Sequence, residues 1–477
     1  MAHLAPYVAA EKHMEPLGFP GSRVDNWQEQ GVAKLGDMLQ KYRSLQVFMD
    51  ICVKCGACTD KCHYFLGTQD PYNMPVQRAE LLRSVYRRYF TPAGQYAPKL
   101  VRAADLDEEM LGKWSTYFHQ CSQCRRCSVF CPYGIDTAEI TMAAREIMDS
   151  IGVGHKYSTE IIGKVHTIGN NLGIPRAALG GTLRFVEDDI LDNTGHEVAL
   201  PVDVHGAEVL LVPPSADFFS EPHISSLMGY AKVFHQAGIS FTVSSYASEA
   251  ANFGMFIGSY AQKQKISQRI AEKARELGVK RIVVGECGHA WRVAYSFWNT
   301  LNGPFDFLDP NYPVPQHICE FTYDLYKKGA LVFDKEANDN LRVTFHDSCN
   351  VARGSRMGSE PGGQMAIPRA LIQATCNHFC EMDQDTIGER TFCCGGGGGL
   401  LTDELMDLRI KGALPRVTAL KQVMKEDKVN YVALICAICK AQFTKILPMY
   451  GIPMETVGGV HQLVNNAIQL GAKKGIV

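Results

Sequence analysis

The spacing C-x2-C-x2-C-x3-C occurs twice near the start of the chain, and each occurrence offers four thiolates in a short loop. Such a run is typical of cubane [4Fe–4S] ligation, because a tight loop wraps three thiolates around three irons of one cube. In two-cluster proteins the fourth cysteine reaches the other cluster. We therefore expect one cubane cluster on Cys52, Cys55, Cys58 and Cys131, and a second on Cys62, Cys121, Cys124 and Cys127.

Residues next to these runs bear on how the clusters would behave. Pro132 follows the second run, whereas His63 stands where a proline usually follows the first. We expect this change to leave ligation intact and to tune the first cluster. Gly56 and Ala57 are small, so backbone N–H groups can approach the sulfurs and control the reduction potential. Zinc would need two separated C-x2-C pairs per site, which does not account for two identical runs.

A different arrangement lies near residue 393, where two adjacent cysteines precede five glycines. Neighbouring side chains on a strand point to opposite faces, so Cys393 and Cys394 can serve one site only if the backbone bends sharply. Glycine permits that bend because it reaches positive φ at little steric cost. A phosphate-binding loop would end in Lys-Ser/Thr, but Leu400-Leu401-Thr402 follows. A vicinal disulfide and a simple flexible turn stay open from these residues alone.

The elements that position these cysteines are predicted by hydrophobic patterning. Beyond residue 206, short apolar strands alternate with helical patterns, which is typical of parallel α/β layers. Two helices are predicted there, over Ile224–Ala237 and Gln262–Leu277. The strand candidates are Glu208–Val212, Phe241–Ser244, Arg281–Val284, Arg342–Phe345 and Tyr431–Ile435.

Helices are also predicted before residue 150. Apolar residues from Trp27 to Leu45 recur at roughly helical spacing, and we expect Asp25 with Gln28 to cap the start. This helix either packs on its own domain or docks a partner. Between the two cysteine runs, Gln77–Tyr89 also reads as helical.

The α/β region contains an internal repeat when its landmarks are compared. In this alignment serines of the first copy stand where the second copy has cysteines, so the first copy has lost most of its thiols. The matching segments are Ala207–Ser215 with Leu341–Cys349, Thr242–Ser245 with Thr391–Cys394, and Lys280–Cys287 with Val429–Cys436.

Five cysteines of the second copy fall at the predicted carboxyl ends of its strands. In parallel α/β folds that edge is where loops converge and ligands bind. The last two form a C-x2-C pair, which suits one metal centre. The five are Cys349, Cys393, Cys394, Cys436 and Cys439.

The order C…CCG…C-x2-C in two tandem copies, behind two ferredoxin motifs, resembles the cysteine-rich (CCG) family of heterodisulfide reductase catalytic subunits. The likeness is to the D subunit of the membrane-bound enzyme and to the K subunit of the Dsr complex, and it covers residues 50–477. It implies an α/β chain in which a small helical bis-[4Fe–4S] ferredoxin-like domain precedes two tandem Rossmann-like α/β CCG repeats. It also implies one noncubane [4Fe–4S] cluster on the five cysteines of the second copy.

The first copy departs from the soluble members of that family, which carry full cysteine sets in both repeats. Ser215, Ser244 and Ser245 leave Cys287 as the obvious survivor, so we expect no second noncubane cluster. The spacings on both sides of the doublet are also longer than usual, which leaves the loop geometry open.

The resemblance implies an iron–sulfur oxidoreductase within a hetero-oligomeric complex. A membrane b-type cytochrome drawing on quinol would supply electrons through the two cubane clusters to the noncubane cluster. That cluster would reduce a heterodisulfide, or a di- or trisulfide on a small sulfur-carrier protein, in either physiological direction. The five cysteines would be catalytic, and we expect His346 to deliver protons. The chain would be cytoplasmic and peripheral on the inner face of the cell membrane through its partner.

Two other functions fit the same motifs. Iron–sulfur subunits of glycolate, lactate and glycerol-3-phosphate oxidising complexes also pair two ferredoxin motifs with CCG repeats and take electrons from a flavoprotein. A pure electron carrier or scaffold is the third class. The sequence has no Gly-x-Gly-x-x-Gly dinucleotide signature, so any flavin would be bound by a partner.

Composition narrows the classes of function. A formal charge of -2 and the lack of a Lys/Arg-rich run argue against nucleic-acid binding. Seventeen cysteines without a secretory signal at the first residues favour metal or redox chemistry in a reducing compartment over a disulfide framework. No stretch is as long and apolar as a bilayer span requires.

The domains expected from these patterns follow one another along the chain. Cys287, Cys319, Cys376 and Cys380 have no assigned role: we expect them to pack in the core, and two alternatives stay open, in which Cys287 borders the substrate pocket and Cys376 with Cys380 forms an accessory metal corner. The expected segments are a helical docking segment at 1–50, the two-cluster ferredoxin-like domain at 51–150, a linker and packing segment at 151–205, the degenerate repeat at 206–330 and the cysteine-bearing repeat at 331–477.

Overall fold

The computed structural model describes residues 17–249 and 251–472. The chain forms two compact units, each assembled from segments that are distant in sequence. The first unit comprises Met1–Gly163, Phe253–Gln262 and Phe392–Pro415. The second comprises Lys164–Asn252, Lys263–Thr391 and Arg416–Val477. The cysteine doublet therefore folds with the two N-terminal cysteine runs.

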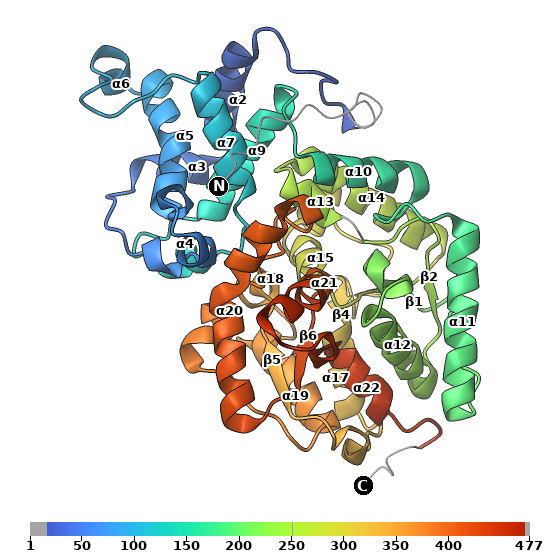
Figure 1. Cartoon of the computed structure of the whole chain (residues 1–477). Coiled ribbons are helices and arrows are strands. Elements are labelled where there is room, and N and C mark those ends of the chain that lie inside the picture. The colour runs from blue at the N-terminus through green and yellow to red at the C-terminus, as the bar shows by residue number, and fades with distance from the viewer. Residues whose placement is uncertain (1–16, 250, 473–477) are drawn as a thin grey trace. The chain divides into compact units, whose positions relative to one another are not determined.

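The first unit is helical and has one main hydrophobic core. Trp114, Phe118 and Ile147 lie in it together with apolar residues of the N-terminal helices. In Figure 1 α5, α7 and α9 lie side by side. The helices of this unit are α2 (Trp27–Lys41), α3 (Arg43–Asp50), α4 (His63–Thr68), α5 (Pro75–Phe90), α6 (Pro92–Tyr96), α7 (Glu108–His119), α8 (Arg126–Val129) and α9 (Thr137–Ser150).

The N-terminal helix differs in detail from its prediction. It forms as α2 and α3, which are separated at Tyr42, where φ is -111° and ψ is 90°. The predicted cap by Asp25 and Gln28 is wrong, because the helix starts after Asn26 and no side chain caps it. The helix predicted over Gln77–Tyr89 is confirmed as α5.

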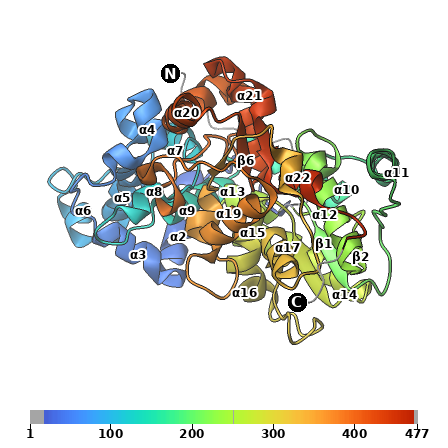
Figure 2. The ribbon, with the colours of Figure 1, turned by 90° about the horizontal axis from the view of Figure 1, so that it is seen from below.

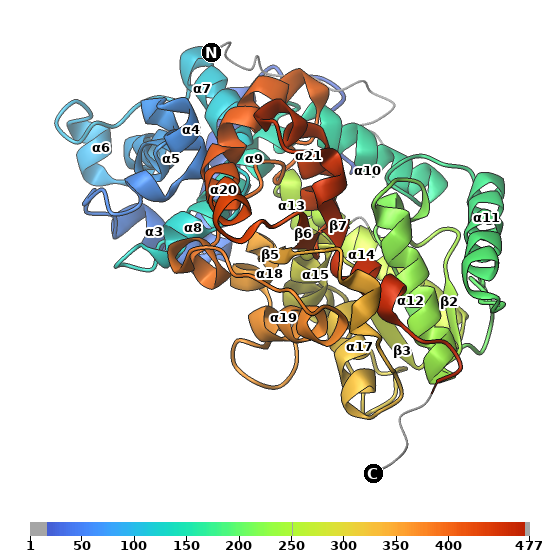
Figure 3. The ribbon, with the colours of Figure 1, turned by 60° about the horizontal axis from the view of Figure 1, so that its bottom comes forward.

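The second unit contains two parallel sheets, which are shown from other sides in Figure 2 and Figure 3. The first has the order β2-β1-β3-β4 and the second the order β5-β6-β7. Most of these strands are wholly buried, as continuous apolar runs in parallel sheets usually are. All five predicted strands are confirmed. The strands are β1 (Val209–Val212), β2 (Phe241–Val243), β3 (Arg281–Val284), β4 (Gln316–His317), β5 (Val343–His346), β6 (Tyr431–Leu434) and β7 (Val457–Gly459).

Helices flank these sheets, and α12 and α22 pack against each other. The helix predicted over Ile224–Ala237 is confirmed as α12, and the one over Gln262–Leu277 as α14. The range 151–205, which we expected to link and pack, holds α10 and α11. The helices of this unit are α11 (Arg176–Thr194), α12 (His223–Ala237), α15 (Gly288–Val293), α16 (Asn299–Asn302), α17 (Ile318–Lys327), α18 (Cys349–Gly354), α19 (Gly363–Thr375), α21 (Ala437–Ile446) and α22 (Val460–Ala467).

Four further helices contain residues of both units. Each is continuous, although the boundary between the units falls within its range. They are α10 (Lys156–Ile168), α13 (Ala251–Phe256), α14 (Tyr260–Glu276) and α20 (Met406–Asp427).

The repeat alignment holds at two landmarks and fails at the third. In the first copy β2 pairs with β1. In the second copy the segment that pairs with β5 in the same way contains Phe379, which forms a parallel bridge with Val343. The range Thr391–Cys394 forms no strand. The doublet therefore does not end a strand, which corrects the expectation that all five cysteines follow strand ends. The extra residues between Phe379 and the doublet form two short 3-10 turns, which accounts for the long spacing.

No helix within residues 17–249 and 251–472 is long and apolar enough to cross a bilayer.

Candidate metal centre

Four cysteines predicted to bind the first cubane cluster line one cavity of the first unit. This cavity is bordered by Cys52, Cys55, Cys58 and Cys131, and also by Cys127. The pKa of the Cys58 thiol is raised to about 11, mainly by burial and to a smaller extent by the neighbouring Cys131 and Cys52 thiols. A buried thiol surrounded by other thiols favours a bound cation, because metal coordination removes the proton that burial retains.

The second predicted set also gathers within this unit. Burial raises the pKa of Cys127 to about 12, and Cys62 and Cys121 contribute in the same direction. A smaller contribution comes from Cys58 of the first set, so the two sets are neighbours. Cys124 is buried. All-thiolate surroundings of this kind fit iron–sulfur clusters, which cysteine thiolates bind.

Two buried arginines of α5 accompany these sets, and sequence reasoning missed both. Arg78 hydrogen-bonds Cys62, and the negative charges of Cys121 and Cys127 also act on it. Arg83 feels the charges of the first set and donates hydrogen bonds of 3.2 Å to the Phe48 carbonyl oxygen. Each set thus has a buried cation, and net charge is one of the factors that set cluster potentials. Their position between the two cysteine runs was the available signal.

The glycines after the doublet allow close contact with the second cysteine run. Gly398 has φ +70°, and a Cβ there would lie 2.6 Å from the Cys121 carbonyl oxygen. Arg145 joins the same two segments, because it donates hydrogen bonds of 2.9 Å to the carbonyl oxygens of Cys121 and Gly398. A larger residue at 398 would push these segments apart.

The doublet itself is buried in this unit. Cys393 and Cys394 are 0% and 1% exposed, and the Gly395 N–H donates to the Cys393 sulfur at 3.4 Å. Tyr64 of α4 donates its hydroxyl hydrogen to the Gly395 carbonyl oxygen at 2.6 Å. The sharp bend expected after the doublet is present, since Gly395 has φ +91°.

His63 connects the doublet with the first cysteine run. Its Nδ1 donates to the Gly412 carbonyl oxygen, and its Nε2 lies 2.7 Å from the Ser122 hydroxyl. Burial lowers the pKa of His63, but the charge of Cys393 and a hydrogen bond to it outweigh burial, so the pKa is raised overall. His63 follows Cys62 directly, so it touches residues beside the second predicted cluster as well as the doublet.

The second unit brings together the other cysteines of the predicted noncubane site. Cys349 begins α18 three residues after β5, and Cys436 stands at the N-cap of α21 two residues after β6. Cys436 is hydrogen-bonded by Cys439, and all three thiols are buried. The expectation that they follow strand ends is confirmed for Cys349 and Cys436. That they share one cluster with Cys393 and Cys394 stays a prediction.

His346 and the unassigned cysteines lie in the same unit. His346 ends β5, is 1% exposed, and has its ring 5.2 Å from that of Phe443. Cys376 is buried beside the Thr375 hydroxyl, 3.7 Å away. The Cys380 backbone N–H donates to the Val343 carbonyl oxygen, so this residue belongs to the strand-like pairing at Phe379.

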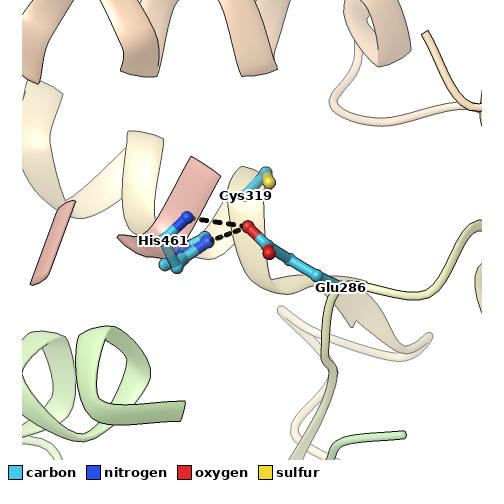
Figure 4. A group of neighbouring side chains, drawn as sticks. All are labelled: Glu286, Cys319 and His461. Carbon is cyan, nitrogen blue, oxygen red and sulfur yellow. Dashed lines mark hydrogen bonds and ion pairs between the residues drawn. The ribbon is translucent and has the colours of Figure 1, made fainter. Parts of the chain in front are cut away.

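A buried polar cluster of Glu286, Cys319 and His461 was not found from the sequence. Their ligand atoms lie within 4.8 Å of one another, and Figure 4 shows His461 bound to Glu286. Glu286 accepts from the Lys440 ammonium at 2.7 Å, and His461 Nδ1 lies 2.8 Å from the same carboxylate. His461 Nε2 lies 2.8 Å from the Thr322 hydroxyl.

This arrangement is an ion-pair network and not a metal site. A lysine ammonium already neutralises the carboxylate, whose pKa Lys440 and His461 hold well below its usual range despite burial. A metal ion there would face the Lys440 charge at close range. Glu286 precedes Cys287, and Lys440 follows Cys439, so the network fixes both strand ends that carry cysteines.

The fold and these cysteines define an iron–sulfur oxidoreductase with a ferredoxin-like part and a cysteine-rich part. Residues 48–135 match the family model of the 4Fe-4S dicluster domain, and residues 343–444 match the cysteine-rich domain. These matches support bound [4Fe–4S] clusters and confirm the resemblance to the CCG family. The chain combines helices with parallel sheets, as expected.

Relatives at full length then show the family. The chain is 41% identical to the Hdr-like menaquinol oxidoreductase iron-sulfur subunit 2 of Archaeoglobus fulgidus, over 98% of this chain and 87% of that protein. The corresponding subunit of Archaeoglobus profundus is 41% identical over 94% and 84%. The D subunit of the dihydromethanophenazine:CoB--CoM heterodisulfide reductase of Methanosarcina mazei is 23% identical over 89% and 95%. The chain belongs to the family of Hdr-like menaquinol oxidoreductase iron–sulfur subunits.

Proposed function

We propose that this chain is the catalytic subunit of a membrane-associated heterodisulfide-reductase-like complex. The two cysteine runs would hold two cubane [4Fe–4S] clusters, which supply one-electron transfer, and the five CCG cysteines would hold a noncubane [4Fe–4S] cluster at which a disulfide or protein trisulfide is reduced. The proposed ligands of that cluster are Cys349, Cys393, Cys394, Cys436 and Cys439.

The observation that carries this proposal is the contact between the doublet loop and the ferredoxin part. His63 is covalently joined to Cys62 and hydrogen-bonds Cys393. Arg145 and Gly398 hold the doublet loop against the carbonyl oxygen of Cys121. A ligand of the second cubane set is therefore connected by bonds and hydrogen bonds to a ligand of the proposed third cluster. That connection supports electron delivery from the cubane clusters to the doublet.

Two arginines and a histidine supply positive charge and a proton near the proposed clusters. The guanidinium of Arg78 offsets the negative charge of the second set, and Arg83 does the same for the first. His346 is our candidate proton donor, because it is buried at the end of β5, three residues before Cys349. Each sulfur released from a disulfide needs one proton in addition to one electron, so a buried imidazole suits that role.

The electron donor we propose is a b-type cytochrome of the membrane that draws on quinol. The printed names of the two Archaeoglobus relatives describe menaquinol oxidoreductase subunits, which supports this donor. The name of the Methanosarcina relatives describes heterodisulfide reduction, which supports the reaction. The electron acceptor is a heterodisulfide or a di- or trisulfide on a small sulfur-carrier protein. The chain then lies at the cytoplasmic face of the membrane through its partner subunit.

Cluster counting combined with activity tests this function. Anaerobically purified protein should hold about 12 irons per chain. Cys393→Ala should remove about four of these, abolish an oxidised, thiol-sensitive EPR signal and end disulfide cleavage, while the signals of both cubane clusters persist. The proposal is wrong if this variant still cleaves the disulfide at the wild-type rate.

A further inference from the structure

The first repeat retains one thiol at the position where the second repeat has a proposed cluster ligand. Cys287 follows β3 and is the N-cap of α15, as Cys436 follows β6 and is the N-cap of α21. Cys287 is 3% exposed and hydrogen-bonds the Cys436 thiol. The two repeats of the second unit therefore place their equivalent cysteines in direct contact.

A second residue of the same turn reaches the same sulfur. His289 Nδ1 lies 3.7 Å from Cys436 Sγ, and the imidazole is 1% exposed. A thiolate that binds iron has no proton of its own, so it can only accept hydrogen bonds. The protons in both contacts must then come from Cys287 and His289.

The helix that follows Cys287, α15, packs against the segment that carries Cys349. A Cβ at Gly288 would lie 2.1 Å from the Ser348 hydroxyl, so a larger residue there would displace the Ser348 side chain. Arg292 donates to the Asn350 side-chain oxygen at 3.0 Å, and Asn350 Nδ2 lies 3.6 Å from Cys349 Sγ. As Figure 3 shows, α15 lies beside α18, and it also contacts α21.

We propose that Cys287 and His289 are positioning residues that donate hydrogen bonds to the Cys436 sulfur and thereby raise the reduction potential of the third cluster. This inference rests on the proposed function, because it takes Cys436 as a cluster ligand. Hydrogen bonds to ligand sulfurs stabilise the reduced, more negative state of such a cluster. In this proposal Cys287 of the first repeat does not bind a cluster but adjusts the reduction potential of the cluster bound by the second repeat.

Redox titration of the full complex, followed by EPR of the third cluster, tests this role. Cys287→Ala should keep about 12 irons per chain. It should lower the equilibrium constant for reduction about tenfold, which is the effect of one lost hydrogen bond and converts to about 59 mV for one electron. Cys287→Ser retains a donor and should fall between Cys287→Ala and the wild type. His289→Ala should lower the potential too, whereas Cys319→Ala, which removes another buried thiol of the same repeat, should not.

Proton spectroscopy supplies an independent readout. ENDOR spectra in H2O and D2O should show a strongly coupled exchangeable proton that Cys287→Ala removes. Unchanged potentials and couplings in both alanine variants would overturn the inference alone. Loss of about four irons from Cys287→Ala would overturn it as well, because Cys287 would then be a ligand. Absence of a third cluster from the wild type would overturn the proposed function and this inference together.

Discussion

The two repeats share their backbone at two landmarks, after β1 and β5 and after β3 and β6, and differ in the side chains there. Cys287 has φ -139° and ψ 109°, and Cys436 has φ -144° and ψ 118°. The short helices after β1 and β5 start at Ser215 and Cys349 respectively. At these landmarks the backbone is therefore the same with a cysteine or a serine, so the fold does not require the thiols.

The serine pair of the first repeat is held by polar contacts. Ser245 donates its hydroxyl hydrogen to Asp203 at 2.5 Å, and its backbone N–H donates to the same carboxylate. Arg176 and Lys273 pair with Asp203 from other segments. A carboxylate at this place would repel a thiolate-bound cluster, which is negatively charged. The cysteine doublet, which folds with the first unit, instead contacts His63.

The largest expected difference between the repeats is in iron content. Cys349→Ala should lower the iron from about 12 to about 8 per chain and end disulfide cleavage, because it removes one of the five proposed ligands of the third cluster. The reciprocal change Ser215→Cys should leave the iron unchanged, since Ser244 and Ser245 still stand where the first repeat would need a pair of thiols. Iron analysis with EPR under anaerobic conditions checks both variants. Iron gained by Ser215→Cys would show that the first repeat has kept a cluster site.

Next in size is the ion pair that links the repeats. Glu286 of the first and Lys440 of the second are both 0% exposed. Lys440→Met should destabilise the fold by about 3–5 kcal/mol, because it leaves a buried carboxylate without its cation. Anaerobic chemical denaturation measures this loss. Lys445→Met, on the exposed side of the same helix, is the matched control and should change stability by less than about 0.5 kcal/mol. If both substitutions lower the stability equally, the buried ion pair does not stabilise the fold as proposed.

A smaller effect is expected where the doublet meets the ferredoxin part. His63→Leu should slow reduction of the third cluster about tenfold at unchanged iron content, a size typical of residues behind metal ligands. His63→Gln keeps a donor and should recover part of the rate. Rapid-freeze EPR after mixing with a reductant follows each cluster separately. If the leucine variant transfers electrons at the wild-type rate, His63 has no part in the connection.

A last prediction concerns the pH dependence of stability, through a buried acid of the first repeat. Burial raises the pKa of Asp217 to about 8. The folded chain holds this proton to about pH 8, whereas an unfolded chain releases it near pH 4. Stability should therefore fall as pH rises between these values, by about 1.4 kcal/mol per unit from this group. Asp217→Asn should flatten that slope, as denaturation at pH 5.5, 6.5 and 7.5 would reveal. If Asp217→Asn leaves the dependence of stability on pH unchanged, the raised pKa of Asp217 is wrong.

Sequence patterns were sufficient for the local motifs and for five of the strands, whereas the short strands β4 and β7 were not predicted. Apolar runs gave β1, β2, β3, β5 and β6, because parallel strands buried on both faces have no polar alternation. The two ferredoxin runs and the CCG motif were recognisable from spacing alone, and both family matches cover them.

Contacts between distant segments could not be predicted in this way. His63 meets Gly412, and Glu286 meets His461, across separations that no local period encodes. The placement of the doublet in the first unit is of the same kind. The burial of Arg78 and Arg83 beside the cysteine sets was also hard to predict, because basic residues on a helix usually face solvent.

Mössbauer spectroscopy of the 57Fe-enriched wild-type chain, purified without oxygen, tests the central claim most directly. The account predicts about 12 irons in three sets of four, with one set unlike the cubane sets and lost in Cys394→Ala. About 8 irons in two ordinary cubane sets, unchanged by that substitution, would contradict it.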